Sequence, residues 1–221
     1  GIMEEPICIV ETCGGDTLEL DNWPPREEGL VGQKTFYLGQ KEKLLPQFRM
    51  DLNMDEPDSF LQRPLFISEE RGKLCYRTAP LSEDLQIVGS PVLKFYASID
   101  QPDTTWRIDM YEGGHQSPWP ITKGWLRASL RKRVPEQDTF WELKHDATKF
   151  DYPVPGEIYE YEIMFRPTAH IFRAGSSIEI EISSIDIPSD ETSYDEMWHL
   201  CKCQTCLHKI YRDKDHFSTL T

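Results

Sequence analysis

The 221-residue sequence lacks any long hydrophobic run. A membrane-spanning helix needs about 18 consecutive apolar residues, and every apolar stretch here is interrupted by polar residues well before that length. The start, Gly1 to Pro6, also lacks the basic region and apolar core of a secretory signal peptide. We therefore expect no membrane partner and a cytoplasmic location, with residues 1–5 being a linker or a remnant of preceding sequence.

Positive charge is scarce, because 24 Lys and Arg residues stand against 38 Asp and Glu residues, for a formal net charge of −14. Such a chain repels phosphate backbones and anionic lipids at long range, so no nucleic-acid partner is expected. The main basic run alternates with apolar residues and predicts the solvated face of a strand. The residues expected to face outward are Arg127, Ser129 and Arg131, and those expected to face inward are Leu126, Ala128 and Leu130.

Cysteine is also sparse, with six residues that are too few and too clustered for a disulfide-stapled scaffold. Reduced thiols are the expectation. Three of them, Cys201, Cys203 and Cys206, lie between His199 and His208 and offer soft zinc ligands at short spacing. Their spacing lacks the paired knuckles of common zinc folds, so no metal is predicted, and a zinc-stabilised module remains an alternative.

Sequence signatures of catalysis are missing. No Gly-x-Ser-x-Gly elbow is present to expose a nucleophilic serine. Neither Gly-Gly pair, at 14–15 or at 113–114, begins a βαβ unit of the kind that binds phosphate, and both pairs predict hairpin turns. In so acidic a chain, a His residue is expected to stand next to Asp or Glu by chance. The adjacent pairs His145-Asp146 and Asp215-His216 are therefore not evidence of catalysis. We predict no catalytic residue, no cofactor-binding residue and no cofactor.

What the sequence does contain is a series of short runs in which apolar and polar residues alternate, separated by turn signals. This spacing predicts an all-β sandwich, formed as a single domain over residues 1–221. The runs are 7–10, 34–38, 74–77, 85–88, 92–99, 107–111, 125–131, 140–144, 159–165, 177–183 and 207–211.

The stretch from Tyr159 to Pro188 carries the clearest strand pattern. Residues 159–165 place aromatic and aliphatic side chains on one face and glutamates on the other, and Ile178–Ile182 alternate more strictly still. We predict two antiparallel strands joined by a substantial loop at 166–175. Only Ser189–Leu200 shows helical spacing, and there a short helix and a long loop are equally consistent with the pattern.

Tryptophan supplies a candidate binding surface. Aromatic faces pack against apolar sugar surfaces, so a saccharide-stacking platform is one interpretation. Core or interdomain packing is favoured, because tryptophan side chains are large and usually mostly buried. The residues concerned are Trp106, Trp119, Trp125 and Trp141.

A family resemblance rests on segments that occur in the same order along nearly the whole chain. They are Asn22-Trp-Pro-Pro25, Phe36-Tyr-Leu38, Gln62-Arg-Pro64, 74–89, 92–103, Gly124-Trp-Leu-Arg-Ala128, Val154-Pro-Gly-Glu157, 167–175, 180–188 and 208–218. With these segments the chain resembles the C-terminal non-catalytic domain of the Xaa-Pro dipeptidyl-peptidase, cocaine esterase and acylase (CocE/NonD) serine hydrolases.

The resemblance implies a jelly-roll β-sandwich similar to galactose-binding domains. It also implies a partner, the N-terminal α/β-hydrolase catalytic domain of the same protein, which carries the catalytic Ser, Asp and His. No position of this chain inherits those roles, so the chain alone is expected to be inactive. Its expected function is to pack against the catalytic domain and to shape or stabilise the active site, and a homo-oligomer contact is a further expectation.

The chain also departs from the family pattern. Residues 45–61 lack the Asp-Pro-x-x-Pro and Gly-Gly motifs of the loop that relatives often place near the active-site mouth, which argues against a substrate-lining role. Thr105-Trp106 replaces an expected aspartate at a strand entry, and the cysteine-bearing segment replaces an Asn-Thr-Gly loop. The alternative function is an independent carbohydrate-binding jelly-roll module.

Overall fold

The computed structural model describes residues 8–20, 33–49, 56–64, 67–68, 70–114, 119–185 and 204–221. Within these ranges the regular structure consists of β-strands and two short 3₁₀ helices, η4 (Ala128–Leu130) and η5 (Pro135–Gln137). The strands are β1 (Cys8–Glu11), β2 (Thr17–Leu20), β3 (Phe36–Gly39), β4 (Lys43–Leu45), β5 (Asp58–Gln62), β6 (Lys73–Arg77), β7 (Leu85–Gly89), β8 (Val92–Ile99), β9 (Thr105–Gly113), β10 (Thr122–Arg127), β11 (Tyr159–Met164), β12 (Thr168–Phe172), β13 (Ser177–Ser183), β14 (Cys206–Tyr211) and β15 (Thr219–Leu220).

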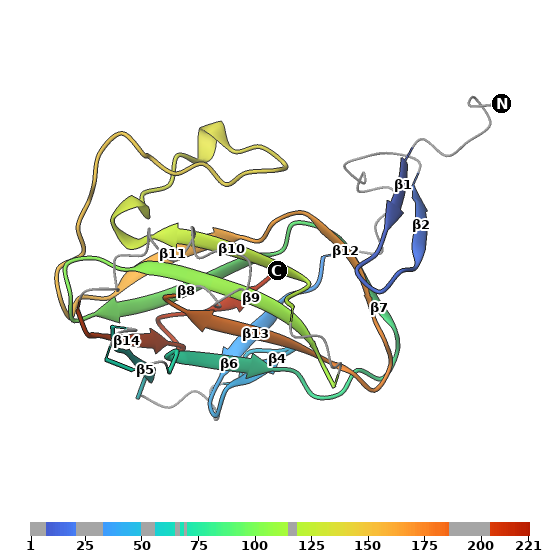
Figure 1. Ribbon diagram of the computed structural model, residues 1–221, viewed down its shortest axis with the longest axis horizontal. Helices are drawn as coiled ribbons and strands as arrows, with labels where there is room; N and C mark the ends of the chain where they lie inside the picture. The colour runs from blue at the N-terminus through green and yellow to red at the C-terminus, as the bar shows by residue number, and fades with distance from the viewer. Residues whose placement is uncertain are drawn as a thin grey trace.

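Eleven of these strands form one large sheet that folds back on itself (Figure 1). One part of it runs β10-β9-β13-β6, with antiparallel pairing throughout. In the other part β8 pairs with β11 on one edge and with β14 and β15 on the opposite edge. A parallel bridge between Lys43 and Arg77 links the two parts through β4 and β6. The all-β class is confirmed, and the arrangement is consistent with a β-sandwich; the jelly-roll connectivity stays a prediction.

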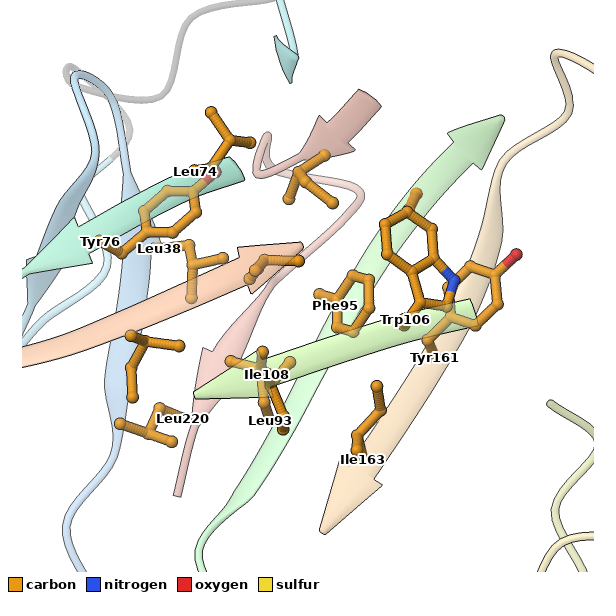
Figure 2. Packing of buried hydrophobic residues seen from close by; sticks show 14 of the residues in the cluster. Leu38, Leu74, Tyr76, Leu93, Phe95, Trp106, Ile108, Tyr161, Ile163 and Leu220 are labelled. Carbon is orange, nitrogen blue, oxygen red and sulfur yellow. The ribbon is translucent and has the colours of Figure 1, made fainter. Parts of the chain in front are cut away.

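Alternation along the strands produces the core. In β9 the side chains of Trp106, Ile108 and Met110 are buried, and the same parity in β11 buries Tyr161 and Ile163. Figure 2 shows the Trp106 side chain beside Phe95 and Tyr161, with ring centroids 5.2 Å and 5.3 Å away. Large aromatic side chains bury more apolar surface than any other residue type, so this cluster is a main source of stability.

Gly124 allows β10 to approach β11 closely. A Cβ atom at this position would lie 2.6 Å from the Met164 carbonyl oxygen and 3.1 Å from the Ile163 side chain. Since no larger residue fits against a neighbouring backbone at that distance, glycine is required where the two edges of the sandwich meet.

Two further two-stranded sheets lie at one end of the molecule, β1 with β2 and β7 with β12 (Figure 1). The turn between β1 and β2 contains Gly15 at φ +86°, as the Gly14-Gly15 pair predicts. The Cys13 backbone N–H donates a hydrogen bond to the carbonyl oxygen of Ala169 in β12 (3.2 Å), so the β1–β2 hairpin packs onto the second small sheet.

The predicted pairing between 159–165 and 178–182 is wrong. Both segments are strands, but β11 pairs with β8, whereas β13 pairs with β6 and β9. The intervening segment, predicted as a loop, contains β12, whose pairing with β7 leads the chain away from the main sheet. Local alternation marks a strand without specifying its partner, which depends on contacts that are distant in sequence.

Two other predictions need correction. The strand expected at 125–131 ends at Arg127, and Ser129 is buried instead of facing outward, because its hydroxyl donates to the Asp103 carboxylate at 2.7 Å. The strand expected at 140–144 is only an isolated bridge between Thr139 and Glu142. Strands that the sequence pattern missed are β2, β4, β5, β12 and β15.

Some predicted features lie outside the described residues. They are the linker at 1–5, the segment Asn22-Trp-Pro-Pro25, the helix or loop at 189–200, and the first part of the cysteine run. Nothing in the described part of the chain forms a helix of the length and apolar character required to cross a membrane.

Candidate functional site

A pocket of about 490 Å³ lies where the β1–β2 hairpin meets the end of the sandwich. Its walls come from the β1–β2 turn, the C-terminal end of β9, the stretch before β10, β12 and the turn after β12. We call it the hairpin pocket. Pockets of about 300 to 1,000 Å³ are typical of small-molecule sites, and this one depends on tertiary structure because its walls are far apart in sequence.

An imidazole–carboxylate pair forms one wall of the hairpin pocket. His170 of β12 lies with its Nε2 3.0 Å from Oε2 of Glu112 in β9, and both side chains are less than a tenth exposed. Burial alone would raise the pKa of Glu112, but hydrogen bonds from the Arg173 backbone, the Ser176 side chain and His170 outweigh it and lower the pKa. Glu112 is therefore held as a carboxylate in the folded chain.

Arg173 forms the outer rim of the pocket. Its guanidinium group donates to Asp84 at 3.0 Å and to Asp16 at 2.5 Å, which links the turn after β12 to the β1–β2 hairpin. Tyr111 also borders the pocket, and its phenol lies near the charged groups of Asp109, Arg71 and Arg107; burial, together with the charge of Asp109, raises the pKa of Tyr111 to about 12. The phenol is therefore protonated at neutral pH and can donate a hydrogen bond.

This arrangement suits binding better than nucleophilic catalysis. An activated nucleophile needs a hydroxyl or thiol within hydrogen-bond reach of the base, and Nδ1 of His170 is buried without a hydrogen-bond partner. A hydroxyl–imidazole contact does occur between Thr104 Oγ1 and His208 Nε2 at 2.9 Å. Both residues are fully buried, and the His208 ring is stacked on Phe60, so substrate cannot reach this pair.

We expect Glu112→Gln to change how stability depends on pH. The folded-state pKa of Glu112 is lowered from 4.5, so its carboxylate contributes stability above about pH 4.5, and this contribution is lost as the pH falls through the folded-state pKa. Urea unfolding should show the variant less stable than wild type at neutral pH, by on the order of 1 kcal/mol. The difference should shrink in acid; a constant difference across pH would contradict the role given to the charge.

The structure disperses the four tryptophans. Trp106 is buried in the core, whereas Trp119 is 61% exposed and lies at the hairpin pocket. Trp125 faces outward from β10, with the cationic groups of Lys123 and Arg166 within 5.2 Å of its ring centroid. Trp141 is exposed beside Phe140. Among the described residues these four rings are not stacked on one another, and Trp119 borders the hairpin pocket.

The cysteine run is only partly described. Cys206 is buried at the start of β14, and Cys201 and Cys203 lie outside the described residues. His208, expected as a flanking ligand, is directed into the core toward Thr104. In the described part of the chain, no three His, Cys, Asp or Glu residues are grouped to hold a metal ion.

A second feature is the loop at residues 128–158, between β10 and β11, which we call the docking loop (Figure 1). It holds six of the eleven large hydrophobic side chains that are exposed in the described residues, with exposures between 38% for Ile158 and 53% for Tyr152. The other four are Phe140, Trp141, Phe150 and Val154.

Polar contacts anchor the docking loop to the sandwich. At its start the Asp103 carboxylate accepts hydrogen bonds from the Ser129 backbone N–H at 3.0 Å and from Arg127 Nε at 2.9 Å. Further on, Arg133 donates to Glu162 of β11 at 2.7 Å and to Asp138 within the loop at 2.6 Å. These contacts hold the loop backbone in place against the sandwich.

Comparison with known proteins yields a family match and two curated relatives. The family of the X-Pro dipeptidyl-peptidase C-terminal non-catalytic domain matches residues 1–193. A protein of Bacillus cereus provisionally named Xaa-Pro dipeptidyl-peptidase is 24% identical over 196 residues, which cover 84% of this chain and 31% of the relative. A protein of Bacillus anthracis with the same provisional name is 23% identical and is covered to 30% of its length. The chain thus spans about a third of these relatives.

Solved structures share the fold. A CocE/NonD family hydrolase from Staphylococcus aureus superimposes with a TM-score of 0.77 at 14% identity, covering 99% of this chain and 41% of that one. An α-amino acid ester hydrolase superimposes with a TM-score of 0.73 at 15% identity, with coverages of 98% and 41%. The family match, over most of the chain, confirms the resemblance of its sequence segments. The chain belongs to the X-Pro dipeptidyl-peptidase C-terminal non-catalytic domain family.

Proposed function

We propose that this chain is the accessory C-terminal domain of a serine hydrolase and packs against an α/β-hydrolase catalytic domain of the same protein. The length of the relatives supports this proposal, because the matching part makes up about a third of each. The catalytic serine, histidine and acid would lie in the preceding domain, and the chain alone would not turn over ester, amide or Xaa-Pro peptide substrates.

The observation that carries the proposal is the set of large apolar side chains on the anchored docking loop. The outer face of β6, β9 and β13 is a poorer candidate for this contact, because it is charged. It carries Lys73, Arg77, Arg107, Asp109, Glu179 and Glu181. Large apolar side chains that are exposed together typically mark a surface that contacts another protein unit. Contacts between domains of one chain usually bury about 600 to 1,500 Å², and the docking loop would supply part of such a surface.

Other parts of the proposal concern the whole chain. Residues 1–221 would form one β-sandwich domain in which residues 1–5 are a linker or a remnant of preceding sequence, and the intact protein would be cytoplasmic. By stabilising the catalytic domain from one side, the docking loop would also shape the rim of the active site, and a dimer contact could use the same surface.

The experiment separates docking from catalysis. The 221-residue chain and the catalytic domain encoded in the same reading frame are produced as separate polypeptides and mixed. We expect co-elution on size exclusion, with p-nitrophenyl ester hydrolysis by the mixture and none by the 221-residue chain. The double variant Trp141→Asp with Tyr152→Asp should bind at least about 100-fold more weakly, because two exposed aromatic contacts become charged groups that must be desolvated.

Phe217→Asp is the matched control, because Phe217 is 44% exposed but lies outside the docking loop. It should leave co-elution unchanged. The accessory role fails if the 221-residue chain hydrolyses the ester by itself and a serine-directed reagent abolishes that activity. The docking surface fails if the double variant, folded by circular dichroism, binds as tightly as wild type.

A further inference from the structure

The geometry points to the hairpin pocket as a binding site for a neutral saccharide. The pocket is separate from the docking loop, and the inference stands independently of the accessory role. Three observations carry it: the pairing of the charged groups in the walls, the exposed indole at the edge, and the mixture of hydrogen-bond donors and acceptors between them.

The charged groups of the pocket are already hydrogen-bonded to partners within the chain. Glu112 accepts hydrogen bonds from His170 at 3.0 Å and from the Arg173 backbone N–H at 2.9 Å. The Arg173 guanidinium is shared between Asp16 and Asp84. A charged ligand would have to displace one of these partners, and displacing His170 would leave the buried Glu112 carboxylate without one of its hydrogen bonds, which is costly. A neutral ligand that hydrogen-bonds to the pairs leaves them intact.

The indole of Trp119 supplies an apolar face beside these polar groups. It is 61% exposed and borders the pocket together with Pro120 and Ile121. Pyranose rings present one apolar face of C–H groups and a rim of hydroxyls, so they match a site with an aromatic face and polar walls. Flat aromatic ligands would use the indole but leave the hydroxyl-binding groups unpaired.

The polar walls offer both donors and acceptors. The Arg173 guanidinium donates, and the Asp16 and Glu112 carboxylates accept. A sugar hydroxyl both donates and accepts, so adjacent hydroxyls can bridge a carboxylate and a guanidinium. The volume of about 490 Å³ lies within the usual range for small ligands and leaves room for one or two rings.

The test is a calorimetric titration of the 221-residue chain with galactose, glucose, mannose, lactose and maltose. At least one should bind, and Trp119→Ala should weaken that binding about tenfold or more, as the loss of about 1.4 kcal/mol of aromatic contact would do. Glucosamine and galacturonate, which are charged, should bind more weakly than the neutral sugars.

Trp141→Ala is the matched control, since it removes another exposed indole outside the pocket and should leave the affinity unchanged. The inference is overturned if none of the five sugars binds, if Trp119→Ala binds as tightly as wild type, or if a charged sugar binds more tightly than its neutral counterpart. None of these results bears on co-elution with the catalytic domain, so the two proposals fail separately.

Discussion

Replacement of Trp106 by alanine is expected to lower the free energy of unfolding by about 3 to 5 kcal/mol, the usual cost of deleting a large aromatic side chain from a core. The indole is fully buried, and its ring lies 5.2 Å from Phe95, 5.3 Å from Tyr161 and 5.1 Å from His208. These neighbours come from three different strands, so they cannot close the cavity by one local shift. A domain of this size has a total stability of about 5 to 15 kcal/mol, so much of it would be lost.

Urea unfolding followed by circular dichroism measures this loss. Trp141→Ala provides the comparison, because it removes the same side chain from a position that is 45% exposed. Surface substitutions usually change stability by no more than about 0.5 kcal/mol. Equal effects of the two variants would show that Trp106 is not a core residue.

The strand content of the fold follows from alternation in the sequence. The pattern predicted β8 (Val92–Ile99) and β13 (Ser177–Ser183) to the residue, because both strands bury one face against the core. It missed β5 and β12, where polar residues such as Gln62 and His170 occupy buried positions and break the apolar pattern. Buried polar residues whose partners are distant in sequence cannot be recognised from local periodicity.

In the docking loop, local periodicity predicts a strand that the fold does not contain. Phe140 to Lys144 alternate as a strand does, but no neighbouring strand is available to them, and the aromatic side chains are exposed. Under the proposed function another domain would cover these side chains, and a single sequence does not distinguish such a pattern from one that is buried in the core. The family resemblance predicted a partner domain but not which segment would face it.

The hairpin pocket was beyond sequence analysis altogether. Glu112 and His170 are 58 residues apart, and Asp16 and Arg173 are 157 residues apart. The sequence analysis treated the adjacent pair Asp215-His216 as a chance neighbour, and the partner that His216 does contact, at 2.9 Å, is Asp213. Nothing in the sequence distinguishes Trp119 from the other three candidate tryptophans, and only the fold shows that it borders the hairpin pocket. Such pairs become visible only when the strand pairings are known.

Asp109→Asn is expected to destabilise the chain by about 3 to 5 kcal/mol, because it removes one charge from a buried ion pair and leaves the other uncompensated. The Asp109 carboxylate is fully buried and accepts hydrogen bonds from both Nε and Nη2 of Arg107, at 2.7 Å and 2.8 Å. Arg107 is only 3% exposed, so water cannot replace the lost charge. The unfolding free energy in urea is again the measurement.

Two comparisons separate the loss of the charge from a general effect of the substitution. Asp215→Asn makes the same chemical change in an exposed pair with Lys214 and should have no measurable effect. Replacing both members of the buried pair, as Arg107→Met with Asp109→Leu, should restore much of the stability, because an apolar pair of similar volume needs no counter-charge. If the double variant were as unstable as Asp109→Asn, hydrogen bonds to the wider network around Arg71 and Glu181, and not the uncompensated charge, would account for the cost.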